Sequence, residues 1–155
     1  MIEPDRINIA TLEGFLRKHA GTGHAQKLSL HPVAVGEHAA KVPFQHLGHH
    51  GGSVLPANRA QECPPADYVD VARIDDIIDD TPTIIKMDVE GHELPALKGA
   101  AGAIRNARPK LMVSAYHRST DLLEIPAWID TIAPDYRIGL RHHTEDRWDT
   151  CLYFY

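Results

Sequence analysis

Apolar and polar positions in the first half of the chain predict a helix, a strand and a long loop. Between residues 4 and 19 apolar side chains recur at helical spacing, which predicts a helix with one buried face. Residues 27–35 alternate apolar and polar side chains and predict a strand, with Pro32 at an edge or irregular position. Residues 42–65 are rich in Gly, Pro, His and Asn and are interpreted as a long excursion, a loose hairpin that returns through residues 68–71.

The middle of the chain has the pattern of a strand, a helix and a second strand. After a short helical turn at residues 74–78, the continuous apolar run at 83–89 is typical of a central parallel strand covered on both faces. Apolar positions from 94 to 104 then give a helical face, with Gly99 as a break. Residues 110–115 predict the next buried strand, so the three segments form a right-handed βαβ unit.

The last third of the chain predicts two short helical segments and a hairpin. Ser119 or Thr120 is a suitable cap for the first segment, and Pro126 is suited to open the second. Residues 136–141 and 150–155 predict two strands separated by a polar turn. The whole pattern is α/β, with a mainly parallel sheet closed by a C-terminal antiparallel pair. The length of 155 residues predicts a single domain over 1–155.

Composition narrows the classes of function. Hydrophobic residues at 43% and charged residues at 24% are ordinary for a globular protein, and no apolar run is long enough for a membrane span. The formal net charge of -5 gives no reason to expect nucleic acid as a partner. Cys63 and Cys151 predict reduced thiols, and the first residues do not resemble a secretory signal, so the cytoplasm is expected.

Candidate chemistry is concentrated just after the apolar strand at 83–89. Asp88 and Glu90 alternate at the end of this strand and are expected to point toward the same crevice, while Gly91 allows close backbone approach. In an open parallel sheet, ligands bind beyond the carboxyl ends of the strands. The alternative is that Glu90 and Glu93 only favour the start of the following helix through its dipole.

The same segment carries a resemblance to a known family. Residues 85–93, read as IKMDVEGHE and followed by LKGA at 97–100, resemble the signature "lKiDvEGxExxxLkGa" of FkbM-type methyltransferases. Further matches occur in order along the chain: IEPD at 2–5, AVG at 34–36, RPKL at 108–111, and YHR at 116–118 with RHH at 141–143. The resemblance implies a Rossmann-like class I sheet and S-adenosylmethionine as cofactor. It also implies O-methylation of a sugar or other small-molecule hydroxyl.

Site residues follow from this resemblance position by position. Glu3 corresponds to the acidic residue that accepts hydrogen bonds from the cofactor ribose, and Val35 to the lining of the adenine ring. Asp88, with Glu90 beside it, falls where the methionine end of the cofactor meets the acceptor. Asp88 is suited either to hold the ammonium group or to position the acceptor hydroxyl. These two roles are not separable from the sequence.

Histidines are the natural bases for removing the acceptor's proton. His117 is the first candidate because it ends a strand at the expected catalytic edge, and His142 and His143 follow at the end of another strand. The alternative is that each is a structural or solvated histidine. His46, His49 and His50 lie in the glycine-rich loop and are expected to be solvated, with acceptor binding as the alternative.

The same residue types are also common metal ligands. Asp88, Glu90, His117, His142 and His143 are potential ligands, but they show no compact metal-ligand spacing. No metal site is therefore predicted. A metal-dependent hydrolase is the last-ranked function.

The resemblance also predicts what this sequence lacks. A class I methyltransferase opens with a strand and a glycine-rich turn that cradles the cofactor, and neither precedes Glu3. We expect the flank of the strand at 83–89 to be left unpaired and the chain to bind S-adenosylmethionine weakly or not at all. A degenerate, non-catalytic binding or scaffold module is the alternative function. Oligomeric state is not indicated by the sequence.

Overall fold

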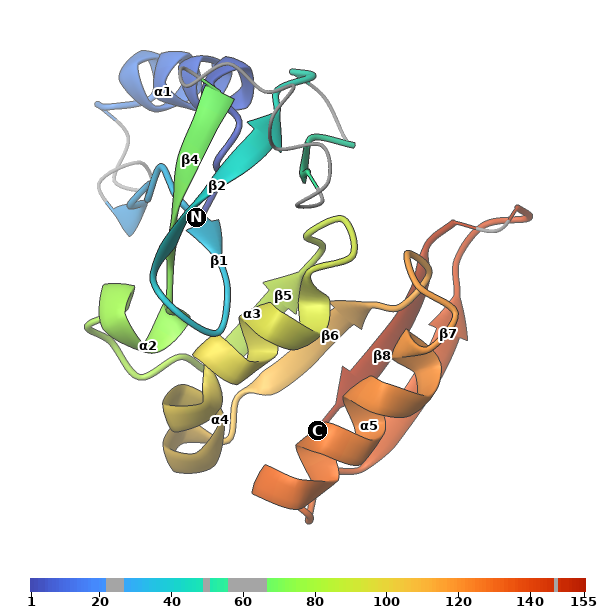
Figure 1. Cartoon of the computed structure of the whole chain (residues 1–155). Helices are drawn as coiled ribbons and strands as arrows, with labels where there is room; N and C mark the ends of the chain where they lie inside the picture. The colour runs from blue at the N-terminus through green and yellow to red at the C-terminus, as the bar shows by residue number, and fades with distance from the viewer. Residues whose placement is uncertain (22–26, 49–50, 56–66, 147) are drawn as a thin grey trace.

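Two four-stranded sheets, each with strands of both directions, form the framework of the protein (Figure 1). The computed structural model describes residues 1–21, 27–48, 51–55, 67–146 and 148–155, and all structural statements refer to these. Cys63, His49 and His50, which the sequence singled out, lie outside the described residues.

The N-terminal sheet is built from short strands in the order β1-β4-β2-β3. Its strands are β1 (Ala34–Val35), β2 (Ala40–Gln45), β3 (Ser53–Val54) and β4 (Tyr68–Ala72). Strand β1 is parallel to β4, whereas β2 is antiparallel to both β3 and β4. A separate parallel bridge joins Ile2 to His31. Helix α1 (Arg6–Lys18) lies beside this sheet, and Asp5 caps it by accepting a hydrogen bond from the Ile7 N–H.

The C-terminal sheet has the order β5-β6-β8-β7. Its strands are β5 (Ile84–Met87), β6 (Lys110–Ser114), β7 (Ile138–His142) and β8 (Thr150–Phe154). Strands β5 and β6 are parallel, while β8 pairs antiparallel with both β6 and β7. The predicted βαβ unit and the terminal hairpin are therefore confirmed.

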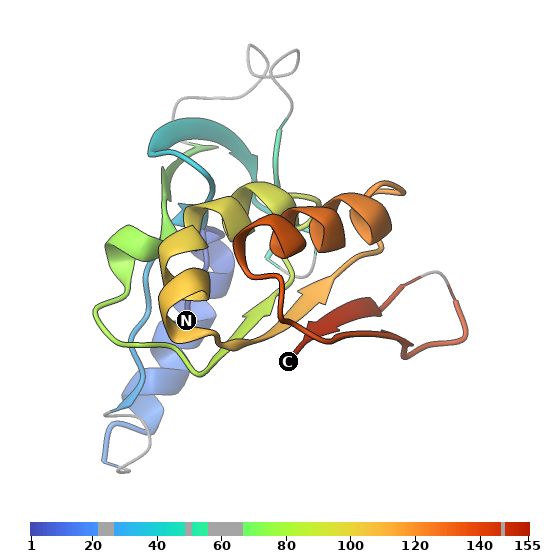
Figure 2. The same ribbon diagram turned by 90° about the horizontal axis from the view of Figure 1, so that it is seen from below.

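Helices cover one face of the C-terminal sheet (Figure 2). They are α3 (Glu93–Gly99), α4 (Ala101–Ala107) and α5 (Asp121–Ile132), and α2 (Ile74–Ile77) packs beside α3 and α4. Alternate residues of β6 and β8 point into this layer, including the buried Leu111, Val113, Leu152 and Phe154. This face therefore carries the main hydrophobic core.

The prediction of a mainly parallel, Rossmann-like sheet is not confirmed. Among the described residues, four of the six strand pairs are antiparallel. A parallel pair needs a crossover connection, usually a helix, and in the C-terminal sheet only α3 and α4 provide one. Strands β7 and β8 are instead consecutive in the chain and pair as neighbours.

Strand β5 corrects a second prediction. It was expected to be central and covered on both faces, but it lies at the edge of its sheet and Ile84 is 60% exposed. Among the described residues, only β6 pairs with it. A continuous apolar run thus predicts this strand but does not predict its position in the sheet.

Three boundaries also differ from the predicted ones. Only residues 34–35 of the predicted strand at 27–35 form a ladder, which fits the backbone restriction that Pro32 imposes. Residues 40–45, largely assigned to the loop, form β2 in spite of Pro43. The two predicted helical segments around Pro126 are one helix, α5, because the buried Ile125 and Ile129 on either side of the proline pack into the core.

In the described part of the chain, every helix is too short or too polar to cross a membrane.

Candidate functional site

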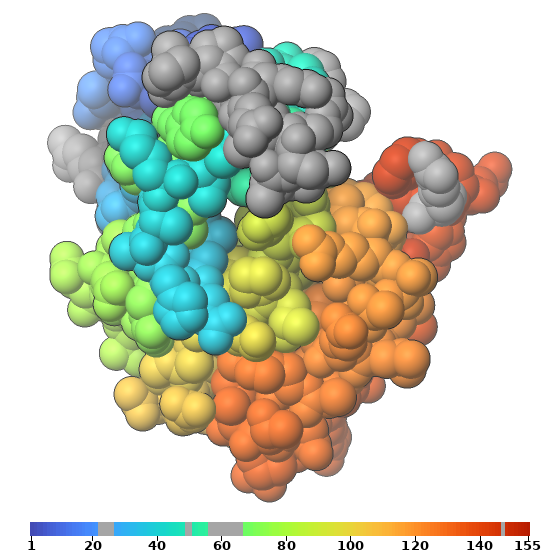
Figure 3. Space-filling view, viewed as in Figure 1, coloured from blue at the N-terminus to red at the C-terminus, as the bar shows by residue number. Residues whose placement is uncertain are grey.

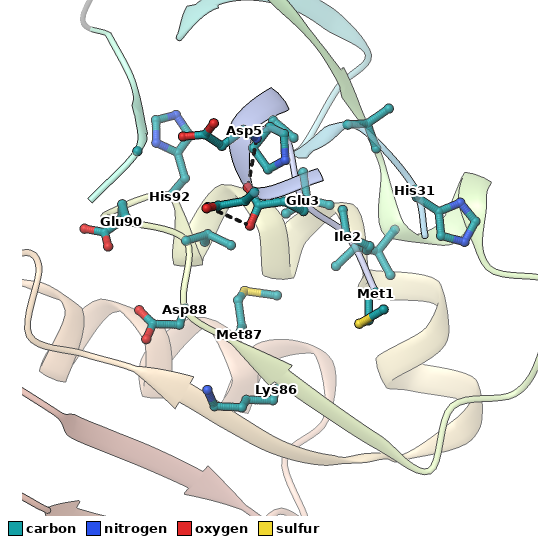
Figure 4. A pocket seen from close by; sticks show the side chains of 18 of the residues that line it. Met1, Ile2, Glu3, Asp5, His31, Lys86, Met87, Asp88, Glu90 and His92 are labelled. Carbon is teal, nitrogen blue, oxygen red and sulfur yellow. Dashed lines mark hydrogen bonds between the residues drawn. The ribbon is translucent and has the colours of Figure 1, made fainter. Parts of the chain in front are cut away.

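A cavity of about 620 Å³ lies between the N-terminal segment and strand β5 (Figure 4). Residues 1–5, β1 and Phe44 contribute one part of its lining, and residues 84–90 contribute the other. In the close-up, Glu3 lies across from Met87 and Asp88. The carboxyl end of β5 therefore opens onto this cavity, as expected for the ligand-binding edge of a sheet.

Glu3 is held in place at the cavity wall by two donors. Its Oε1 accepts a hydrogen bond from the Asp5 N–H at 2.8 Å, and its Oε2 lies 3.4 Å from the Asn8 side-chain nitrogen. These contacts follow from the sharp entry of the chain into α1, which brings residues 3, 5 and 8 together. The carboxylate is thus oriented before any ligand arrives.

Asp5, which the sequence did not single out, is the polar centre of the N-terminal half. It is 1% exposed, and its Oδ2 accepts hydrogen bonds from the Leu47 and Gly48 N–H groups at 2.8 and 2.9 Å. Burial by itself raises the pKa of Asp5, but the Gly48, Ile7 and Leu47 N–H groups and the nearby His46 outweigh it and hold the pKa below its usual range. His46 was expected to be solvated, but its side chain is only 5% exposed because its Nδ1 lies 3.5 Å from the Asp5 carboxylate.

A tight turn follows β5 and fixes the two predicted carboxylates. Glu90 has a φ of 54° and Gly91 a φ of 89°, so two successive residues adopt left-handed backbone. Glycine adopts this conformation without strain, whereas Glu90 does so at some cost. The turn brings the chain back over β5 into α3, with Asp88 and Glu90 both lining the cavity.

His117 lies behind these carboxylates in a cage of three acidic side chains. Its Nδ1 is 2.9 Å from Glu93 Oε1, and its Nε2 is 3.2 Å from Glu90 Oε2 and 3.8 Å from Asp88 Oδ1. The side chain of His117 is 9% exposed and that of Glu93 is fully buried. The Glu93 Oε1 also accepts a hydrogen bond from the Val89 N–H at 3.0 Å.

The cage shifts the protonation of both buried partners. Burial favours the neutral imidazole, but the adjacent Glu93, Glu90 and Asp88 carboxylates outweigh it and raise the pKa of His117. Burial likewise favours neutral Glu93, but His117 and the Val89 N–H hold its pKa below the usual value. The pair therefore favours an imidazolium beside a carboxylate.

Tyr116 connects this cage to the surface. Its hydroxyl donates to Asp88 Oδ1 at 3.1 Å, and its ring lies against the His117 ring with centroids 4.0 Å apart. Burial, followed by the Asp88 carboxylate, raises the pKa of Tyr116, so the hydroxyl stays a donor at neutral pH. Asp88 is thereby oriented by a neighbour that the sequence did not single out.

The structure brings some of the predicted site residues together and separates others. Glu3, Val35, Asp88 and Glu90 all line the cavity. His117 is not part of this lining, because the cage of acidic side chains buries it. His142 ends β7 with its Nδ1 2.8 Å from the Thr150 hydroxyl, outside the cavity lining.

His143 and two buried carboxylates also lie outside the cavity lining. His143 Nε2 is 2.7 Å from the Tyr153 hydroxyl. Glu93 and Asp121 are both buried, and the sequence did not assign them to the site. A polar residue directly after a glycine-containing turn was the available signal for Glu93, but nothing in the sequence shows that Asp121 is buried. The catalytic roles predicted for His117 and His142 stay predictions.

Comparison with known proteins agrees with the resemblance in the sequence. A family model described as Methyltransferase FkbM domain matches residues 1–138. No curated protein matches the chain.

A solved structure shows that the similarity extends to the three-dimensional fold. The chain is similar to the methyltransferase FkbM from Methylobacillus flagellatus KT, with 52% sequence identity and a TM-score of 0.82. The match covers 100% of this chain and 36% of that one. The chain therefore spans about a third of the length of the solved relative.

Proposed function

The chain belongs to the FkbM methyltransferase domain family, and on that premise we propose that it serves methyl transfer from S-adenosylmethionine to a hydroxyl of a sugar or other small molecule. The observation that carries this proposal is the cavity between Glu3 and Asp88. It gathers Glu3, Val35, Asp88 and Glu90 from three separate parts of the sequence. The free Cys151 thiol supports a reducing compartment, and we place the reaction in the cytoplasm.

The lining of the cavity fits this cofactor. A volume of about 620 Å³ lies within the range of small-molecule sites, and the wall combines carboxylates with apolar side chains such as Val35 and Met87. Glu3 would hold the ribose hydroxyls, Val35 would line the adenine, and Glu90 would face the ammonium group. When bound, the cofactor supplies an electrophilic methyl group.

Asp88 is the group best placed to act on the acceptor. It lines the cavity, and the Tyr116 hydroxyl orients its carboxylate. We assign it the acceptor hydroxyl: one of its oxygens would accept the hydroxyl proton while the methyl group leaves the cofactor sulfur and the new carbon–oxygen bond forms. His117 is then a positioning residue. Its Nε2 lies 3.8 Å from Asp88 and 3.2 Å from Glu90, and its raised pKa favours the imidazolium, which has no free lone pair to accept a further proton.

Binding of the cofactor to these 155 residues tests the proposal. Titration of S-adenosylmethionine into isotopically labelled protein is expected to shift backbone amide signals near Glu3, Val35 and Asp88. We expect a dissociation constant of about 1 mM, which corresponds to about 4 kcal/mol of binding free energy. Affinity is expected to be low because the outer edge of β5, which borders the cavity, has no strand partner among the described residues.

Two variants separate specific from incidental binding. Glu3→Gln, which removes the charge of the carboxylate assigned to the ribose, is expected to weaken the shifts, whereas Asp130→Asn, which removes an exposed carboxylate from α5, is the matched control. Absence of shifts at about 5 mM cofactor, beyond the weak end of ordinary binding, would overturn the proposal and favour a non-catalytic module. Shifts of equal size in both variants would also count against it.

A further inference from the structure

The acidic cage around His117 contains more than an ion pair. Glu93 Oε2 and His117 Nε2 are buried, and neither has a hydrogen-bond partner among the described residues, although Nε2 forms an ion pair with Glu90. A buried polar atom without a partner is costly, and proteins leave few of them. We propose that Asp88, Glu93 and His117 form a binding site for a divalent metal cation.

The geometry of the three side chains suits one shared ion. One ligand atom from each of them lies within 4.8 Å of the others. Donors around a common divalent cation sit about 2.0–2.2 Å from it, so a small inward movement completes the set. Glu90 Oε2, at 3.2 Å from His117 Nε2, is in reach as a further oxygen ligand.

Charge at the cage also favours a cation. Asp88, Glu90 and Glu93 surround one imidazole, so even a protonated His117 offsets only one of three negative charges. Asp121 adds a fourth carboxylate and, with Glu93, is one of the two that are buried; its pKa is raised by burial and further by Glu93. The basic side chain of Arg118 lies beside Gly91 and acts on Asp121. Buried like charges repel strongly, and a divalent cation removes this repulsion.

The kind of ion follows from the ligands. Carboxylate oxygens suit Mg²⁺ and Mn²⁺, and imidazole suits the later transition metals. A mixed set of two or three oxygens and one nitrogen therefore favours Mn²⁺ or a similar ion. The sequence showed no metal motif because the three ligands come from separate places: the end of β5, the first turn of α3 and the segment after β6.

A closed ion pair between His117 and Glu93 is the competing explanation. It accounts for the 2.9 Å contact between Nδ1 and Oε1. It does not account for Glu93 Oε2 or His117 Nε2, which it leaves buried without hydrogen bonds. A cation satisfies these atoms together with the surplus charge.

Titration of the full 155-residue chain with Mn²⁺ tests the site. Binding is followed as loss of the electron paramagnetic resonance signal of free Mn²⁺, in the absence of S-adenosylmethionine. We expect one bound ion per chain, and we expect Glu93→Gln, His117→Ala and Asp88→Asn each to weaken binding about 10-fold or more. Because no cofactor is present, failure here is distinct from failure of the proposed methyl transfer.

A control variant and a folding measurement accompany the Mn²⁺ titration. Asp130→Asn removes one exposed negative charge and is expected to leave the affinity unchanged. Circular dichroism establishes that each variant folds, and Asp88→Asn carries the test if substitution of the buried Glu93 unfolds the chain. No loss of free signal at roughly 1 mM Mn²⁺, the weak end of functional cation sites, would overturn the proposal. Equal affinity in the parent and the three ligand variants would do the same.

Discussion

The two halves of the molecule are held together by different forces. The C-terminal half has an apolar core between its sheet and helices α3, α4 and α5, whereas α1 in the N-terminal half has no fully buried residue. Among the described residues, Val35 is the sole member of the buried core cluster that precedes residue 73. Buried Asp5 instead joins α1 to residues 47 and 48 by hydrogen bonds. The second half thus has the larger apolar core, whereas the first half combines a few buried apolar side chains, such as Phe44, with the polar contacts of Asp5.

The candidate site lies where these halves meet. Glu3 and Val35 come from the first half, and Asp88 and Glu90 come from the second. Figure 3 shows the segment after β1, in light blue, packed against α3, in yellow. A ligand in the cavity therefore depends on this contact as well as on its own partners.

Leu97→Ala is expected to have the largest effect, because it removes apolar contacts from the better-packed half. Leu97 is fully buried in the core cluster, and a buried leucine reduced to alanine costs about 2–5 kcal/mol of unfolding free energy. Urea denaturation followed by circular dichroism measures this loss.

Phe15→Ala is the matched substitution in the other half. Phe15 lies on α1 and is 52% exposed, so its truncation is expected to cost less than about 1 kcal/mol. Equal losses from the two substitutions would contradict the contrast between the halves.

Gly99→Ala tests the contact between the halves directly. A Cβ at Gly99 would overlap the backbone carbonyl oxygen of Gly36. Backbone atoms cannot avoid such an overlap by a change of rotamer, as a flexible side chain can. We expect a loss of about 1–3 kcal/mol, measured by urea denaturation, together with changed amide signals on both sides of the contact. Unchanged signals for residues 34–36 would show that the halves are not packed as described.

Asp5→Asn tests the polar centre of the N-terminal half. The asparagine oxygen can still cap α1, but its NH₂ group then faces the Leu47 and Gly48 N–H groups, which need an acceptor. The expected loss of unfolding free energy is about 1–2 kcal/mol. The folded pKa of Asp5 lies below its unfolded value, so its stabilisation is present above the unfolded pKa and is lost as pH falls through the folded pKa.

The pH dependence supplies the control for this substitution. The difference in unfolding free energy between the parent and Asp5→Asn is expected to be constant from neutral pH to about pH 5, and to shrink below pH 4. Urea denaturation series at several pH values measure it. A difference that stays constant down to pH 2 would exclude the ionised carboxylate as the cause.

Local sequence patterns predicted most elements correctly but not their neighbours. The strand at residues 84–87 follows from short-range periodicity, and the predicted helix break at Gly99 lies one residue before the observed one at Ala100. The edge position of β5 and the antiparallel pairing of β8 with β6 depend on contacts between distant segments, which periodicity does not record. Residues 40–45 were missed because Pro43 is unusual within a strand.

The sequence likewise predicted some features of the candidate site and not others. The resemblance located Glu3, Val35, Asp88 and Glu90, which all line one cavity. It did not show that His117 is buried, since that depends on Glu93 from α3 folding back onto it. A residue type at the end of a strand thus indicates where chemistry is possible, while burial decides which group faces the ligand.

Gly14→Ala is expected to have the smallest effect, and of the opposite sign. Gly14 lies within α1, and a Cβ there would meet no atom within 4 Å. Alanine is favoured over glycine inside a helix by about 0.5–1 kcal/mol, so the substitution is expected to raise the unfolding free energy slightly, measured by the same denaturation. The same change of residue at Gly99 is expected to be destabilising, because there the backbone of the other half occupies the space. If Gly14→Ala instead lowered stability, α1 would have to pack closely against the N-terminal sheet on that side, and the contrast between a loosely and a tightly packed half would no longer hold.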